Sequence, residues 1–118
     1  MHEFSLANQI FIQLQEMAVS HNMAGISRVT IQAGRMRQIV PEALDAAFEA
    51  IVSGTVADGA ALQLEIIEPL VECRACGHRF APETDSFQCA ECGQADVDIV
   101  EGNDIIIRSV EYEEDSNG

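Results

Sequence analysis

Two stretches of the chain carry apolar residues at the spacing of an amphipathic helix. The first covers residues 4–20 and has Ser5 as a candidate N-cap. The second begins near Pro41, which the first turn of a helix tolerates, and ends before Gly54, a common residue just beyond a helix C-terminus. The apolar positions that define these helices are Leu6, Ile10, Leu14, Met17, Leu44, Ala47, Phe48 and Ile51. The pattern predicts two helices, each with one buried face.

Three further stretches have the alternation or composition of strands, namely residues 26–33, 60–67 and 104–112. In the first of them, Val29 and Ile31 share a face with Ala33, and the residues between them are polar. Because a strand, a helix and a second strand follow one another with short connections, we expect a crossover unit. The simplest architecture is one small α/β domain whose sheet is completed by the last of the three strands.

Four cysteines form two Cys-x-x-Cys pairs, Cys73/Cys76 and Cys89/Cys92, and a glycine follows each pair. Two residues between the cysteines of a pair allow both sulfur atoms to reach one ion, and the glycine accepts the left-handed backbone of such a turn. Two facing pairs give a tetrahedral four-thiolate site with sulfur about 2.3 Å from zinc. One pair alone would leave a redox dithiol open, whereas two pairs favour structural zinc. A redox role that modulates the zinc site remains an alternative.

The segment around the cysteines depends on its metal. About 25–30 residues cannot bury enough surface to fold alone, and structural zinc contributes about 10–16 kcal/mol in small peptides. Four protein thiolates leave no coordination position for a catalytic water. We therefore expect a zinc-ribbon module of residues 69–97, inserted into a domain formed by residues 1–68 and 98–118. His78 is interpreted as a surface residue of the ribbon, with a switching or ligand role as the alternative.

The charge balance argues against nucleic acid as a partner. The chain has 20 acidic residues against 6 basic ones, all arginine, and a net charge of −14 at pH 7. Residues 71–96, which hold the cysteines, have a net charge of −3, so the basic patch that phosphate binding needs is missing. An acidic field attracts divalent cations and basic partners, although solubility alone also explains it.

Several other classes of function find no support in the sequence. The longest apolar runs, such as Ile105–Ile107, are too short to span a membrane. The amino terminus has neither a basic nor an apolar region of a signal peptide, and a cytoplasmic protein is the plain expectation. No nucleophile lies in a recognisable turn and no glycine-rich loop is suited to phosphate. We therefore do not expect an enzyme.

The first three residues, Met1, His2 and Glu3, are a common way for a chain to begin, but they offer a set of nitrogen donors. The bulky His2 should keep Met1 in place, so that the Met1 amine and the backbone nitrogen and imidazole of His2 can chelate one ion. Glu3 can add its backbone nitrogen or its carboxylate. Such donors in a square-planar or tetragonal set favour nickel(II) or copper(II). The amine titrates near pH 7.7–8.0 and must lose a proton to bind, so nickel affinity should fall with pH.

Together these features resemble the HypA/HybF family of hydrogenase nickel-incorporation proteins, over nearly the whole length of the chain. The residues that carry the resemblance are Met1-His2-Glu3 with Ser5-Leu6-Ala7, Val40-Pro41-Glu42-Ala43-Leu44 with Ala47-Phe48-Glu49, the stretch Gly54-Thr55 and Gly59-Ala60 with Leu62, and both cysteine pairs with Gly77 and Gly93. The zinc pattern alone is shared by many ribbons. Combined with the amino-terminal triplet and the Pro-Glu-Ala-Leu helix, it is specific.

The resemblance implies a non-enzymatic nickel metallochaperone. It assigns nickel to Met1, His2 and Glu3, and structural zinc to Cys73, Cys76, Cys89 and Cys92. It implies an α+β fold with a small mixed β-sheet, two helices and an inserted zinc ribbon. The implied partners are the GTPase HypB and the large subunit of NiFe hydrogenase, and in some organisms urease and its accessory proteins. A monomer or a weak homodimer is expected.

One stretch departs from the family pattern. Many relatives carry an acidic residue directly after the glycine of the first strand, whereas this chain has Gly34-Arg35-Met36-Arg37. The arginines form either a docking patch for an acidic partner or a solvated loop. Two alternatives to nickel delivery remain at this point, namely a zinc-ribbon adaptor without nickel and a nucleic-acid-binding ribbon.

Overall fold

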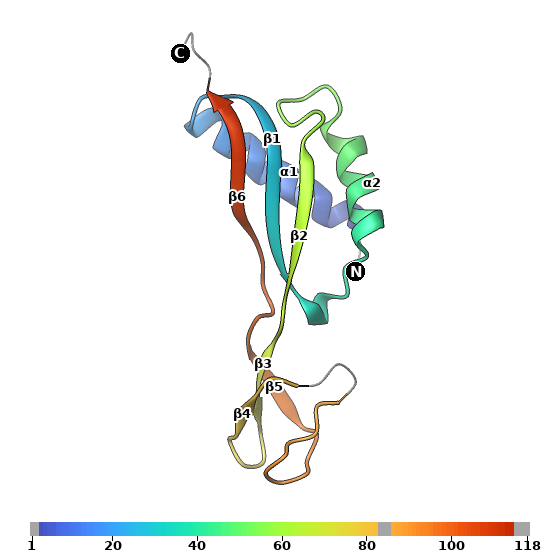
Figure 1. Cartoon of the computed structure of the whole chain (residues 1–118), viewed down its shortest axis with the longest axis vertical. Helices are drawn as coiled ribbons and strands as arrows, with labels where there is room; N and C mark the ends of the chain where they lie inside the picture. The colour runs from blue at the N-terminus through green and yellow to red at the C-terminus, as the bar shows by residue number, and fades with distance from the viewer. Residues whose placement is uncertain (1–2, 83–85, 115–118) are drawn as a thin grey trace.

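The computed structural model describes residues 3–82 and 86–114 of the chain. The molecule is elongated, with extents of 62 × 25 × 16 Å, and Figure 1 shows helices at one end and a small second sheet at the other. The elements are α1 (Glu3–Ser20), β1 (Met23–Gly34), the 3-10 helix η1 (Arg35–Arg37), α2 (Pro41–Val52), β2 (Ala61–Ile67), β3 (Leu70–Cys73), β4 (Arg79–Phe80), β5 (Val97–Glu101) and β6 (Ile105–Glu114). Among the described residues, no helix is long and apolar enough to cross a membrane.

The larger sheet has the strand order β2-β1-β6 and is mixed. β1 runs parallel to β2 and antiparallel to β6. Parallel neighbouring strands need a crossover connection. Here α2 provides it, because it lies between β1 and β2 in the sequence and packs against the sheet. The predicted α+β class, with two helices and a small mixed sheet, is confirmed.

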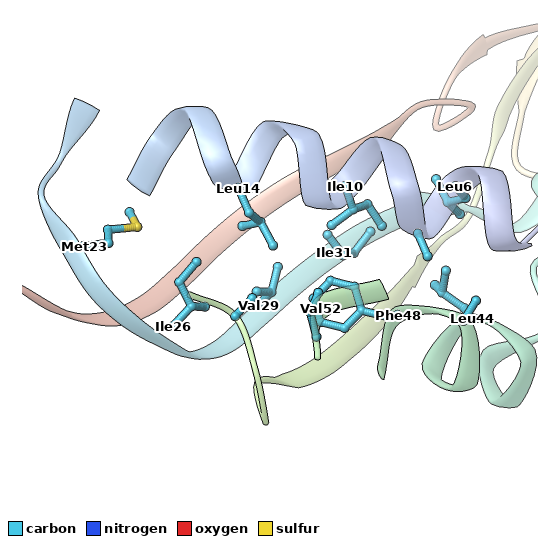
Figure 2. Close-up of a cluster of buried hydrophobic side chains, with 13 residues drawn as sticks. Leu6, Ile10, Leu14, Met23, Ile26, Val29, Ile31, Leu44, Phe48 and Val52 are labelled. Atoms are coloured by element: carbon cyan, nitrogen blue, oxygen red, sulfur yellow. The ribbon is translucent and has the colours of Figure 1, made fainter. Parts of the chain in front are cut away.

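The core lies between this sheet and the two helices (Figure 2), where side chains of α1 point toward those of β1 and α2. Val29, Ile31 and Ala33 on β1 are fully buried, as their alternation predicts. The large buried side chains of the helices are Leu6, Ile10, Leu14, Leu44, Phe48 and Val52. Ser5 as N-cap is wrong: it lies inside α1, whose first described residue is already helical.

The second sheet has the order β4-β3-β5 and carries the first cysteine pair at the end of β3. β5 pairs antiparallel with β3, with Glu72 opposite Asp98 and Cys73 opposite Val97. The predicted boundary after residue 97 therefore falls inside β5. The short run Val97–Glu101 has no composition that separates it from the next strand, and only its pairing assigns it to this sheet.

The chain passes twice between the two sheets, at Glu68–Pro69 and at Gly102–Asp104, and the end of β1 with η1 (Gly34–Arg37) lies against both passages; we call these three segments the neck. Its backbones touch: a Cβ atom on Gly34 would lie 2.1 Å from the carbonyl oxygen of Gly102. Gly102 has a φ of +79°, and a Cβ there would lie 2.6 Å from the carbonyl oxygen of Glu68. Only glycine fits at these two crossings.

Side-chain contacts also join the three segments of the neck. Arg35 Nε lies 2.7 Å from Glu68 Oε2, and Arg37 Nε donates to the carbonyl oxygen of Asn103 at 2.6 Å. The amide of Gly34 also donates to the Asp104 carbonyl at 3.1 Å. Both arginines of the stretch that departs from the family pattern therefore bind within the chain, to the two segments that link the sheets.

Candidate metal centre

The two cysteine pairs adopt the same backbone turn. Cys73 ends β3, and the amide of Gly77 donates to its carbonyl oxygen at 2.8 Å. The amide of Gly93 donates to the carbonyl oxygen of Cys89 at the same distance. Both glycines have a φ of +78°, the left-handed backbone that the sequence predicted at these positions. Each turn is therefore a knuckle that presents its two sulfur atoms on one side.

The knuckles face each other and bring the four sulfur atoms together. The Sγ atoms of Cys73 and Cys92 are 3.5 Å apart, and those of Cys76 and Cys89 are 3.6 Å apart. All four ligand atoms lie within 4.8 Å of one another. A tetrahedron with zinc–sulfur bonds of about 2.3 Å has edges of about 3.8 Å, whereas a disulfide would hold two sulfurs about 2.0 Å apart. All four cysteines are free, and their arrangement fits a four-thiolate metal site.

The surroundings of the cluster lower the pKa of one cysteine and raise the pKa of two others. The backbone amide of Cys76 lowers the pKa of Cys73 to about 7. At Cys76 the backbone amide of His78 lowers the pKa, but desolvation and the other three cysteines outweigh it and raise the value to about 12. The pKa of Cys92 is also raised, despite a backbone hydrogen bond at Gln94, because Cys73 and desolvation oppose its charge. Four thiolates this close need a bound cation to coexist.

An arginine inside the first knuckle holds the cluster to β5, and sequence reasoning missed it. Arg74 Nη1 lies 2.9 Å from Asp96 Oδ1, and its Nε lies 2.9 Å from Asp98 Oδ1. The hydrogen bond and charge of Arg74 lower the pKa of Asp98, and the Arg74 amide donates to the Asp96 carbonyl at 2.9 Å. The signal in the sequence was an arginine between two cysteines and two aspartates spaced two apart, which is too common to stand out.

His78 follows the first knuckle, and its ring packs against an aromatic side chain of β4. The ring stacks on Phe80 with centroids 5.7 Å apart and planes inclined by 13°. Its carbonyl oxygen accepts a hydrogen bond of 2.9 Å from the amide of Cys73. The four-cysteine group found among the described residues does not include it.

The predicted nickel triplet is only partly described. Met1 and His2 lie outside the described residues. Glu3 starts the described part of α1, and its Oε1 accepts a hydrogen bond of 3.3 Å from the amide of Val40. Val40 directly precedes α2, so the amino-terminal ends of both helices lie next to the Glu3 carboxylate.

The chain matches known proteins over nearly its whole length. The family model described as "Hydrogenase/urease nickel incorporation, metallochaperone, hypA" matches residues 1–112. The chain is 38% identical over 114 residues to a hydrogenase maturation factor HypA of Chlorobium limicola, covering 97% of this chain and 98% of the relative. It is 30% identical over 115 residues to the HypA of Aquifex aeolicus, covering 98% and 100%.

A solved structure agrees in fold. The solution structure of the Ni metallochaperone HypA from Helicobacter pylori superposes with a TM-score of 0.73 at 26% identity. The match covers 98% of this chain and 100% of that protein. The similarity therefore extends through both sheets and the neck that joins them.

Proposed function

The chain belongs to the HypA family of hydrogenase and urease nickel-incorporation metallochaperones, and from this membership we propose that it binds nickel(II) at Met1, His2 and Glu3. It delivers the ion for maturation of NiFe hydrogenase. The observation that carries the proposal is the family match, which begins at the first of these residues and continues to residue 112. The Met1 amine and the backbone nitrogen and imidazole of His2 supply the donors.

The surroundings of Glu3 suit an ion that must be released. Helix amino termini carry partial positive charge, which opposes a nearby cation. The starts of α1 and α2 lie together at Glu3, whose carboxylate already accepts a hydrogen bond from Val40. The carboxylate offsets the helix dipoles without adding a strong soft ligand. The site therefore holds nickel reversibly, which is the property that delivery requires.

The four cysteines take a structural zinc(II) ion. The sulfur–sulfur distances of 3.5 and 3.6 Å support a tetrahedral ion with soft ligands. Since Cys73, Cys76, Cys89 and Cys92 fill every position, the ion has no site for a reactive water and serves the fold. A non-enzymatic role rests on the family, whose members are maturation factors. The zinc-binding part corresponds to the predicted residues 69–97 extended through β5, and the nickel-binding part to the rest.

The proposed delivery of nickel implies several partner proteins. The GTPase HypB supplies the hydrolysis that this chain lacks, the hydrogenase large subunit receives the ion, and urease accessory proteins are the corresponding partners where urease is served. The protein acts in the cytoplasm. Nucleic acid is not a partner, because both arginines of the zinc-binding part, Arg74 and Arg79, are ion-paired with acidic side chains.

Calorimetric nickel titration tests the proposal. The chain beginning at Met1 is compared with a chain that carries one additional residue before Met1. The extension removes the amine from the chelate, so nickel affinity should fall by at least roughly a hundredfold if the amine is a ligand. Equal affinity in both chains would remove the amine from the site.

Two histidine variants separate the two metals. His2→Ala should lose nickel and keep one zinc ion per chain, whereas His21→Ala, at the exposed far end of α1, should keep both. Loss of zinc as well as nickel from His2→Ala would mean that the sites are not separate. A zinc-ribbon adaptor without nickel function is the competing proposal, and it predicts that no variant, including the parent chain, binds nickel.

A further inference from the structure

β6 forms one edge of the larger sheet. It pairs with β1, and among the described residues no strand pairs with its other side (Figure 1). Alternate residues of such a strand direct their N–H and C=O groups away from the sheet, where they can pair with another chain. The strand covers ten residues, from Ile105 to Glu114, and so offers a long edge.

The two halves of β6 differ in how this edge is protected. The half after Ile107 carries Arg108, Glu111, Glu113 and Glu114, and its register with β1 shifts between Ile107 and Ser109. Charges and bulges are the usual means by which proteins prevent pairing at an edge. The half Ile105–Ile107 has neither, and the side chain of Ile106 is 50% exposed. The open part of the edge is therefore the isoleucine run.

A groove follows this same half of the strand on the helical face of the sheet. It has a volume of about 340 Å³ and lies between α1 and β6. Leu6, Ile10 and Ile107 give it an apolar lining, and the exposed residues Gln9 and Gln13 on α1 form its rim. A strand added at Ile105–Ile107 would direct every second side chain to this face of the sheet. The open edge and the groove thus form one surface.

We propose that this surface binds an extended segment of a partner protein, which adds to β6 as a further strand. The segment carries apolar residues at its centre, one of which enters the groove and the next of which covers Ile106. It carries basic residues at its ends, because Asp104 is exposed directly before the isoleucine run and the chain as a whole has a net charge of −14. Two arginines lie near this edge. Arg108 is ion-paired with Glu65 at 2.8 Å, and Arg37, which lines the groove, donates to the carbonyl oxygen of Asn103.

The charge of the chain favours such a partner over a second copy of itself. Two chains with a net charge of −14 repel each other, and pairing of their edges would bring more carboxylates together. Salt should therefore weaken binding of a basic partner and strengthen association of two copies, since screening reduces both attraction between unlike charges and repulsion between like charges. The inference stands on the surface alone and does not depend on nickel binding.

The test uses the full chain with zinc bound and no nickel. The probe is a fluorescein-labelled peptide, Lys-Val-Ile-Val-Lys with both ends blocked, and binding is followed by fluorescence anisotropy. Saturable binding is expected, weaker in high salt. It should be lost when the lysines are replaced by glutamate and when the central peptide nitrogen is methylated, which removes a ladder hydrogen bond.

A matched pair of variants locates the binding site on the surface. Gln13→Arg places a bulky cation on the rim of the groove, whereas Gln15→Arg makes the same change on a part of α1 that does not line it. The first should weaken peptide binding by roughly tenfold or more, and the second by less than about twofold. Equal effects of the two variants, or no saturable binding up to about 1 mM peptide, a limit of about −4 kcal/mol, would overturn the proposal. Sedimentation that shows salt-strengthened self-association, abolished by Gln13→Arg, would assign the edge to a second copy and equally overturn it.

Discussion

The close backbone contact in the neck predicts that one added methyl group, at Gly34, destabilises the fold. In Gly34→Ala the new Cβ would lie 2.1 Å from the backbone oxygen of Gly102, well inside an ordinary contact of about 3.5 Å. The oxygen belongs to the backbone and cannot rotate away, so the strand crossing must open. Overpacking of this kind costs about 1–3 kcal/mol, against about 0.4–1 kcal/mol gained from the stiffer unfolded chain. We expect a net loss of about 1–2.5 kcal/mol, because a contact this short places the cost in the upper part of its range.

Gly25→Ala is the matched control, because Gly25 lies on the same strand and a Cβ there meets nothing within 4 Å. It should leave the free energy of unfolding within about 0.5 kcal/mol of the parent chain. Urea unfolding of the zinc-loaded proteins, followed by circular dichroism, measures both values. If Gly34→Ala proved as stable as Gly25→Ala, the close contact between Gly34 and Gly102 would be refuted.

Three further outcomes are expected. Phe48→Ala should destabilise the protein by about 3–5 kcal/mol in urea unfolding, because the ring is 2% exposed, whereas Phe4→Ala, at 64% exposed, should change stability by less than about 0.5 kcal/mol. Removing zinc with a chelator should abolish hydrogen-exchange protection in β3 and β5 and leave α1 and β1 protected, because the small sheet depends on about 10–16 kcal/mol of metal binding; protection that persists in β3 would refute this. The lowered pKa of Asp98 stabilises the fold above the unfolded value of about 3.9, and this stabilisation is lost as the pH falls through the folded value. In Arg74→Met the pKa of Asp98, measured by NMR titration, should return toward that unfolded value.

The sequence predicted the elements whose side chains have a strong period. α1 and α2 appear where their apolar spacing placed them, and the alternation at Val29, Ile31 and Ala33 correctly identified the buried face of β1. The cysteine knuckles were also predictable, because the spacing and the following glycines constrain the turn locally. These features depend on residues that are close together in the chain.

Features that depend on distant contacts were not predictable. Ile66 shares a face with the partly buried Leu62 and Leu64 by alternation but is itself 47% exposed near the end of β2. The pairing of β5 with β3 and the hydrogen bond between Glu3 and Val40 join segments separated by some 25 to 37 residues. No local pattern encodes such pairings. The neck is of the same kind, since Gly34 and Gly102 become necessary only where their backbones meet.

The arginines illustrate how such contacts change a functional interpretation. Read from the sequence, Arg35 and Arg37 formed a docking patch for an acidic partner or a solvated loop. In the structure all six arginines of the chain are engaged within it: five form ion pairs and Arg37 binds a carbonyl oxygen.

The engagement of the arginines determines what an approaching partner encounters. With its cations bound to carboxylates or to the backbone, the chain presents an excess of uncompensated negative charge, in line with its net charge of −14. Such a field concentrates divalent cations and basic segments within a Debye length of about 8–10 Å. Glu3 and the groove residue Leu6 are less than one helical turn apart on α1, so both are reached through the same field. The proposed nickel site and the proposed strand-binding surface are therefore neighbours within one acidic field.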